Sequence, residues 1–568
     1  MNEKPNPIKE EANEEISEVN AVSRRKFFGN MGKAAITVAA LGSAPLIDPK
    51  ARASAQRNLP GYERAVKSLN FKIAAAQDNF FNTQLRFPRT NNGDESRYAN
   101  KIGNFSKGLP HQSNGEVDVS AYNQQLLALN SQVPADFELI PLAGDRKLAN
   151  PQSGLAMDIE GRDCFGLRMA PAPAFASREN AAEIAENYWM ALLRDVPFED
   201  YPNSPTAQAA AADLNIFGND FKGAKNAKGQ VTPELLFRGL TPGDKTGPYL
   251  SQFFYQTCNF GANKIDQQIK TARAIADGGA DYMIDFDSWL AVQNGVSPQN
   301  GDIFDPTLRY MRNGRDIGQY VHVDVLFQSY FQAFLVLAGM GAPFDSGNPY
   351  LNSATQDGFA TFGGPHVAAL LCEVSTRALK SIWNQKWFVH RRLRPEVFAE
   401  RVDRTAFHGA DYPIHQEILD SINTASRLGG FIPAGNAFLP QAFPEGSPMH
   451  PSYGAGHATV AGACVTVLKA FFDESFVIPN PVMPDPTGQV LVPYTGDPLT
   501  VGGELNKLAS NISLGRNIAG VHWRSDGTES NKLGEELAIT VMRDHRNCYN
   551  EQFGGFSLTK FNGTTITV

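Results

Sequence analysis

Residues 316–338 are apolar almost all the way round a helical projection, which strongly limits the folds open to the chain. The apolar side chains here include Ile317, Tyr320, Val321, Leu326, Phe327, Tyr330, Phe331 and Phe334. A helix with no polar face has to be buried on every side. We therefore expect one central, buried helix over this segment, with other helices packed around it.

Three further segments carry the apolar stripe of a helix that packs on one face. The stripes are Ala181/Ile184/Ala185/Tyr188/Trp189/Leu192, Val367/Leu370/Leu371/Val374/Ala378 and Val460/Cys464/Val467/Leu468/Phe471. Ser177 is placed to cap the first of these helices. Strand patterns are limited to two short runs, residues 490–494 and 564–568. With neither βαβ alternation nor a nucleotide-binding glycine loop in the sequence, we expect a mainly α fold with function on its long loops.

Composition narrows the class of protein further. The 568 residues contain 51 Lys+Arg and 59 Asp+Glu, a net charge of −8, which disfavours binding to nucleic acid or to an anionic membrane surface. The five cysteines are scattered without a CxxC pair, so a zinc ribbon or a thioredoxin-like site is not expected. We expect residues 56–568 to form a single large helical unit.

Residues 1–55 have the three parts of an export signal. A basic run with Arg24 and Arg25 precedes a 13-residue apolar stretch, Ala34–Leu46, and two overlapping A-x-A sites follow at Ala51–Ala55. The paired arginines before Phe-Phe resemble a twin-arginine signal. As a helix this stretch rises about 20 Å, too little for a bilayer core of about 30 Å. We expect an exported, periplasmic or secreted protein without stable membrane insertion; an amphipathic helix or a membrane anchor is the alternative.

Residues 386–395 are the first of three segments with chemical character. Four cations and a histidine lie within residues 386–394, and Pro395 follows. Taken alone, such a run is most often a solvated basic face. The interleaved Trp387, Phe388, Val389 and Leu393 weaken that interpretation. We expect an anionic group to contact Lys386 and Arg394.

Residues 450–458 form a glycine-rich turn, HPSYGAGHA, that leads into the predicted helix ending at Phe471. The first amides of a helix have no intrahelical partner and lie at the positive end of its dipole, so they form an anion site. His457 lies at this helix start, where we expect it to act as a base. The alternative is a histidine that only caps the helix.

Residues 515–526 form the third segment. Arg516 and His522 are six residues apart, so both side chains can face one pocket. Asp526 lies four residues beyond His522 and can orient its ring. Gly520 permits another backbone or a ligand to approach closely. The alternative is an ordinary surface helix.

Together the three segments supply one lysine, two arginines, a helix-start amide and two histidines. Three fixed cations suit phosphate or its analogue vanadate far better than a carboxylate. The combination predicts a site for a tetrahedral, multiply charged oxyanion. One histidine would attack or ligate the oxyanion and the other would transfer protons.

The order of the motifs, K-x₇-R-P, then P-S-Y-x-x-G-H, then R-x₃-G-x-H-x₃-D, resembles the vanadium-dependent haloperoxidases. That family shares its site plan with the type 2 phosphatidic acid phosphatases. Residues 188–201, 314–350 and 359–396 are similar to the algal and cyanobacterial bromoperoxidase branch, and the resemblance extends over most of residues 60–550. It implies a helical fold built around four-helix bundles and a bound vanadate.

The resemblance also implies roles for individual residues. Lys386, Arg394 and Arg516 would hold the vanadate oxygens, together with the Gly456 amide. His522 would be the ligand to vanadium.

His457 would be the acid–base catalyst, Lys386 would polarise the reacting oxygen, and His450 would be a further histidine near the site. The implied reaction oxidises halide with hydrogen peroxide to hypohalous acid, which halogenates a small organic acceptor. We expect bromide and iodide to be preferred over chloride, and a homo-oligomer.

One departure from the family pattern leaves alternatives open. Ala455 stands where the family usually has a serine that hydrogen-bonds the vanadate, a loss of ~1.5–3 kcal/mol. Gly515 likewise stands where family members often have serine. An acid phosphatase would use the same residues, with His522 as nucleophile and His457 protonating the leaving group. Ala455 also leaves room for a non-catalytic oxyanion-binding protein.

Overall fold

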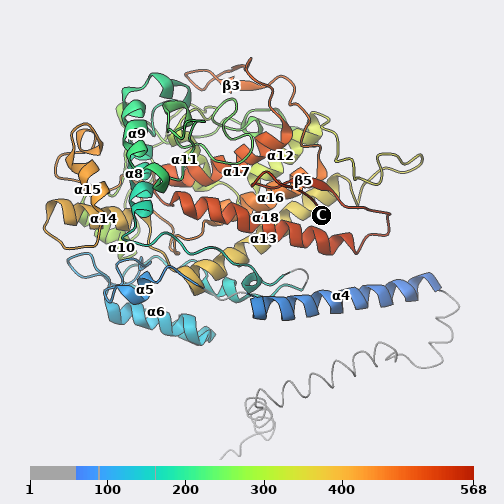
Figure 1. The fold of residues 1–568 in the computed structure, drawn as a ribbon, viewed down its shortest axis with the longest axis horizontal. Coiled ribbons are helices and arrows are strands. Elements are labelled where there is room, and N and C mark those ends of the chain that lie inside the picture. Colours follow the sequence, from blue (N-terminus) through green and yellow to red (C-terminus); the bar gives the residue numbers. More distant parts are fainter. Residues whose placement is uncertain (1–58, 87–89, 160–161) are drawn as a thin grey trace, which may run out of the picture. The chain divides into compact units, whose positions relative to one another are not determined.

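The computed structural model describes residues 59–86, 90–159 and 162–568. Contacts divide the chain into two units, Met1–Ala74 and Ala75–Val568. Helix α4 (Leu59–Arg86) contributes residues to both. The predicted export signal, residues 1–55, lies outside the described residues. The second unit carries all three chemical segments, and many of its elements are labelled in Figure 1.

Four helices form the bundle on which the second unit is built: α13 (Gly364–Asn384), α16 (Gly456–Phe471), α17 (Val501–Ile518) and α18 (Arg524–Arg546). Helix α16 packs against the other three (Figure 1) and is buried at every position from Ala458 onward. Two glycines permit its close approach to α18. A Cβ atom on Gly462 would lie 2.1 Å from the Asn531 carbonyl oxygen, and one on Gly534 would lie 2.0 Å from that of Thr459. The bundle confirms the predicted mainly α fold.

The prediction of one helix over residues 316–338 is wrong. The structure has two helices there, α11 (Gly314–Val323) and α12 (Gln328–Gly339), which are bent by 104° relative to each other. Asp324 has extended backbone angles, φ −62° and ψ 144°, and ends α11. Both helices are largely buried, so an apolar pattern runs through the sequence of each and hides the break between them. The break itself reaches the surface, because Val323 and Val325 are 69% and 58% exposed.

A second group of helices surrounds α8 (Arg178–Leu192), which Ser177 caps as predicted by accepting a hydrogen bond from the Asn180 amide. Helix α8 packs against α9 (Pro205–Ile216), α14 (Pro395–Phe407), α15 (Gln416–Asn423) and α17. The remaining α-helices of this unit are α5 (Asp94–Arg97), α6 (Val119–Ser131), α7 (Pro134–Phe137) and α10 (Phe286–Gln293). No single helix among the described residues is long and apolar enough to cross a membrane, although the bent α11–α12 pair reaches that hydropathy when taken together.

The strands found among the described residues form three antiparallel hairpins. They are β1 (Cys258–Phe260) with β2 (Asn263–Ile265), β3 (Val482–Pro484) with β4 (Leu491–Pro493), and β5 (Ser557–Thr559) with β6 (Thr565–Thr567). The strand runs predicted at residues 490–494 and 564–568 are confirmed as β4 and β6.

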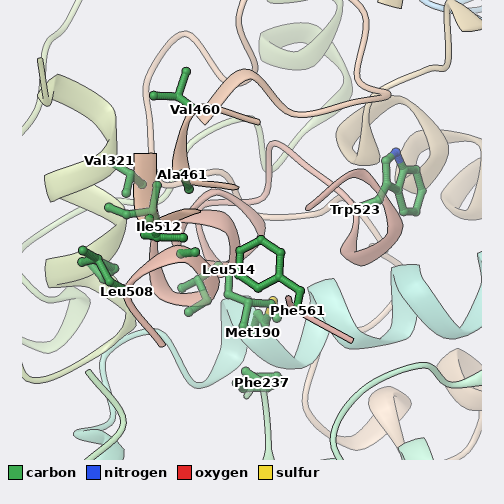
Figure 2. Close-up of a cluster of buried hydrophobic side chains, with 14 of the residues drawn as sticks. Met190, Phe237, Val321, Val460, Ala461, Leu508, Ile512, Leu514, Trp523 and Phe561 are labelled. Carbon is green, nitrogen blue, oxygen red and sulfur yellow. The ribbon is translucent and has the colours of Figure 1, made fainter. Parts of the chain in front are cut away.

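The core beneath the chemical segments draws on several helices at once. Figure 2 shows Val321 of α11, Val460 of α16, Ile512 of α17 and Trp523 among the side chains of this cluster. Trp523 is fully buried, and its indole Nε1 donates a 3.0 Å hydrogen bond to the Leu393 carbonyl oxygen. The third chemical segment is thereby tied to the first.

Candidate active site

The structure brings side chains from all three chemical segments into contact. Lys386 Nζ lies 2.8 Å from His450 Nδ1, and Arg394 Nη2 lies 2.9 Å from the same nitrogen. Arg394 Nη1 lies 3.0 Å from His522 Nε2. The four side chains are buried, although they come from positions up to 136 residues apart (386 to 522).

The backbone around Lys386 departs from α-helical geometry. Helix α13 ends at Asn384 and continues as a π-helical turn, Gln385–His390, a feature often found at functional sites. Lys386 is fully buried and its Nζ lies 4.8 Å from the centre of the Trp383 ring. Of the other cations in this run, Arg391 pairs with Glu95, and Arg392 with Glu183 and Asp526. A solvated basic face is therefore excluded.

Hydrogen bonding determines which ring nitrogen of His522 carries the proton. Arginine has only donors, so Arg394 donates to His522 Nε2, and that nitrogen keeps its lone pair available as an acceptor. The proton is therefore on Nδ1, which donates a 2.8 Å hydrogen bond to Asp526 Oδ2. Asp526 thus orients the His522 ring, and Ser452 donates to the same carboxylate oxygen. The arrangement presents an unprotonated Nε2 to the centre of the site.

Both buried histidines are neutral. Burial lowers the pKa of His450 and of His522 far below the ordinary value, and the charges of Lys386 and Arg394 act in the same direction. His450 Nδ1 accepts from both of these cations. Neither ring therefore carries the second proton, whose positive charge would repel the cations around it.

Lys386, Arg394 and Arg516 form no ion pair among the described residues, and carboxylates such as Asp526 and Asp324 act on them only from beyond ion-pair distance. Burial lowers the pKa of Lys386 well below its usual range, and repulsion from Arg394 and Arg516 adds to the effect. Burial also lowers the pKa of Arg394 to about 9 and that of Arg516 to about 10. The Arg516 Nε is buried without a hydrogen-bond partner among the described residues. This donor set fits an oxyanion with several negatively charged oxygens, which would relieve the repulsion.

The start of α16 adds backbone donors to the site. The amides of the first turn have no partner within the helix, as in any α-helix. Ala455, which precedes the helix, provides no side-chain cap for them. A Cβ atom on Gly456 would lie 3.1 Å from the Trp383 ring, the ring that also contacts Lys386 and His450. Trp383 therefore brings the helix start close to the cations.

His457 lies at the second position of α16 and is the most accessible of the predicted histidines, with 21% of its side chain exposed. Its Nε2 lies 2.9 Å from Asp324 Oδ1, in the break between α11 and α12. Burial acts to raise the pKa of Asp324, but His457 and Arg516 outweigh it and the pKa is lowered. Asp324 is therefore a carboxylate at neutral pH and can orient the His457 ring.

Comparisons with known proteins agree over nearly the whole chain. A family model described as the VCPO second helical-bundle domain matches residues 374–551. The vanadium-dependent bromoperoxidase of Corallina officinalis is 35% identical over 89% of this chain and 98% of its own length. That of Ascophyllum nodosum is 33% identical over 89% and 93%. The chain belongs to the vanadium-dependent haloperoxidase family.

Solved structures place the fold of this haloperoxidase in the same family. The homohexameric structure of the second vanadate-dependent bromoperoxidase from Ascophyllum nodosum has a TM-score of 0.80 and 29% identity. The structural alignment covers 92% of this chain and 91% of the Ascophyllum nodosum chain. The likeness extends to the region before residue 374, outside the match to the family model.

Several site residues of this haloperoxidase were missed from the sequence. Asp324, Trp383 and Phe443 lie in no recognised motif, yet each contacts a predicted site residue. A signal for Asp324 was present, because His322 and Asp324 are the sole charged or histidine residues between positions 317 and 344. Ionisable side chains in an apolar stretch need partners, and that points to a site.

Proposed function

We propose that this chain uses bound vanadate and hydrogen peroxide to oxidise bromide and iodide to hypohalous acid, which then halogenates small organic acceptors. The observation that carries the proposal is the unprotonated Nε2 of His522, which accepts a hydrogen bond from buried Arg394 and feels the charges of buried Lys386 and Arg516. The acid phosphatase and the non-catalytic binding protein are not favoured, because relatives that match 89% of the chain are bromoperoxidases.

The residues present fit vanadate as the oxyanion. Lys386, Arg394 and Arg516 would hold its oxygens with help from the Gly456 amide, and His522 Nε2 would ligate the vanadium. Bound vanadate supplies a Lewis acid that activates hydrogen peroxide without changing its own oxidation state. The Asp526 carboxylate fixes the His522 ring in the tautomer that ligation requires.

Proton transfer falls to His457 in this proposal. Its side chain reaches the exposed edge of the site, so it is placed to take a proton from incoming hydrogen peroxide. Asp324 would stabilise the resulting imidazolium, and Lys386 would place its ammonium against the oxygen that the halide attacks. His450 remains neutral between Lys386 and Arg394 and keeps a polar group beside the reacting atoms.

Vanadate should switch the activity on. We expect protein stripped of oxyanions to gain bromide- and iodide-oxidising activity when orthovanadate is added, with phosphate competing for the same site. The reason is that three cations distinguish two tetrahedral anions poorly. Initial rates of monochlorodimedone bromination, measured against vanadate concentration with and without phosphate, test this. Activity that is unaffected by vanadate removal would contradict the proposal.

The matched variant for this experiment is Ala455→Ser, which restores the hydroxyl that the family usually has. We expect it to change vanadate affinity or bromide turnover by no more than about 100-fold, the value of one hydrogen bond to a charged group.

Chloride turnover of the wild-type protein should be slow or absent. Chloride is the hardest halide to oxidise, and both His450 and Ala455 favour the halides that are easier to oxidise. Chloride rates equal to bromide rates would show that neither residue sets the halide limit.

Export and assembly complete the proposal. We infer from the basic run, the short apolar stretch and the A-x-A sites that residues 1–55 direct export through the twin-arginine route. We expect Arg24→Lys together with Arg25→Lys to keep the precursor in the cytoplasm. Mass spectrometry of exported protein should find a mature N-terminus near Ala53 or Ala55; intact residues 1–40 would refute this.

A homo-oligomer is also proposed, because the Ascophyllum nodosum neighbour is homohexameric. Light scattering gives the mass of the particle in solution, which checks this proposal.

A further inference from the structure

A stack of rings lies beside the oxyanion site, and none of its members belongs to the motifs. The His322 imidazole stacks on the Phe443 ring, with centroids 3.8 Å apart and planes 9° from parallel. The Arg516 guanidinium carbon lies 5.4 Å from the centre of the same Phe443 ring. Phe443 therefore contacts a site arginine and a histidine outside the site.

Arg516 has few other contacts that determine where it points. Its Nη1 donates a 2.6 Å hydrogen bond to the Val321 carbonyl oxygen, and its Nε has no partner among the described residues. None of the ion pairs among these residues includes Arg516. Arg394, in contrast, donates to the carbonyl oxygens of His450 and Val521 as well as to two histidine rings. The Phe443 ring is therefore a main determinant of the Arg516 position.

Phe443 itself is held rigidly. It is 1% exposed and belongs to a small apolar cluster with Ala442, Ala519 and Val521. The Ala442 amide donates to the Ala519 carbonyl oxygen at 3.1 Å, which ties the loop to the connection between α17 and α18. Buried Lys107 donates to the carbonyl oxygens of Glu445 and Ser447 at 2.9 Å and 2.7 Å. The ring has little freedom to follow a moving guanidinium.

His322 is fixed by two carboxylates. Its Nε2 lies 2.7 Å from Glu445 Oε1, and its Nδ1 lies 3.4 Å from Asp302 Oδ2. Burial alone would lower the pKa of His322, but these two contacts raise it to about 9. An imidazolium and a guanidinium are both attracted to an aromatic ring.

We propose that His322 is a positioning residue for the oxyanion site, which acts through the stacked Phe443 ring to hold Arg516 in place. The inference rests on the proposed function, because it assigns Arg516 to the bound oxyanion. His322 contacts Arg516 only through this ring, so it takes no direct part in binding. Loss of the stack leaves Arg516 with one backbone hydrogen bond and weakens the oxyanion site without removing it.

The test measures oxyanion affinity in place of turnover. Equilibrium dialysis of the full chain against orthovanadate, and separately against inorganic phosphate, gives Kd values for wild type, His322→Gln, Phe443→Leu and the double variant. We expect each single variant to raise both Kd values about five- to tenfold, the value of one cation–ring contact. Because His322 acts through Phe443, the two losses should not add. The Kd of the double variant should exceed the larger of the two single-variant Kd values by no more than about twofold.

Two controls separate positioning from a general loss of stability. His408→Gln removes a histidine that pairs with Asp403 at 3.2 Å elsewhere, and this variant should bind both anions within about twofold of wild type. Thermal unfolding is followed for every variant. If Phe443→Leu does not fold, the difference in Kd between His322→Gln and His408→Gln shows whether His322 positions Arg516.

Three results would overturn the inference: Kd values within twofold of wild type for His322→Gln, additive losses in the double variant, or an equal loss in His408→Gln. Failure of the proposed function has a different signature. In that case wild type itself binds neither vanadate nor phosphate. A wild type that binds both anions while His322→Gln matches it removes only the positioning role.

Discussion

Replacing His457 with alanine is expected to lower bromide turnover by about 100- to 10,000-fold, the range of general acid–base catalysis, while vanadate affinity stays within about tenfold of wild type. The physical reason is the division of labour in the site. His457 is partly exposed and pairs with Asp324, whereas the buried cations and His522 are the proposed contacts to the oxyanion. Steady-state kcat at saturating vanadate and dialysis of the same samples give the two numbers.

The matched variant is Asp324→Asn, which keeps the His457 ring but removes the negative charge that stabilises its imidazolium. We expect a smaller loss of turnover, about 10- to 100-fold, as is typical for a residue that orients a catalytic histidine. Vanadate loss in His457→Ala as large as in His522→Ala would contradict the assignment of His457 to proton transfer.

Replacing His522 with alanine is expected to weaken vanadate binding by at least about 100-fold, equivalent to roughly 3 kcal/mol. The substitution removes the proposed covalent ligand. It also leaves Arg394 Nη1 and Asp526 Oδ2 without the ring that they contact at 3.0 Å and 2.8 Å. Equilibrium dialysis against orthovanadate measures the loss, and thermal unfolding shows whether the variant folds.

Phosphate provides the internal control for His522→Ala. The three cations are expected to bind either anion, but only vanadium would gain a bond from Nε2, so phosphate affinity should fall less than about tenfold. An equal loss for both anions would show that His522 organises the cations and does not ligate the metal. Vanadate binding unchanged by the substitution would remove His522 from the site altogether.

Sequence patterns predicted individual helices better than the relations between them. The stripes at 181–192, 367–378 and 460–471 each correspond to one helix, because a one-sided apolar face is a local property of the chain. The interpretation of 316–338 as one helix failed because two consecutive buried helices share the same apolar pattern. A polar residue at the break, Asp324, was the local sign of the bend.

The candidate site likewise shows which contacts the spacing of residues can predict and which it cannot. Spacing alone could place Asp526 against His522, since both lie within a few residues of each other, and the structure has that contact. It could not place Lys386 against His450, a contact over 64 residues. Phe443 reaches Arg516 only through tertiary packing, as Trp383 reaches His450, and such packing leaves no periodic signal in the sequence.

The burial of α16 has a consequence for how the cofactor is acquired. Its first turn is part of the proposed oxyanion site, and the rest of the helix lies in the centre of the bundle, where it packs closely against α18 at Gly462 and Gly534. Amides so placed exchange with solvent hydrogen only when the whole unit opens. We therefore expect the first turn to keep its conformation when the oxyanion departs. Reloading requires diffusion of the anion into a finished site, without refolding, and a bound oxyanion adds to stability only by mass action.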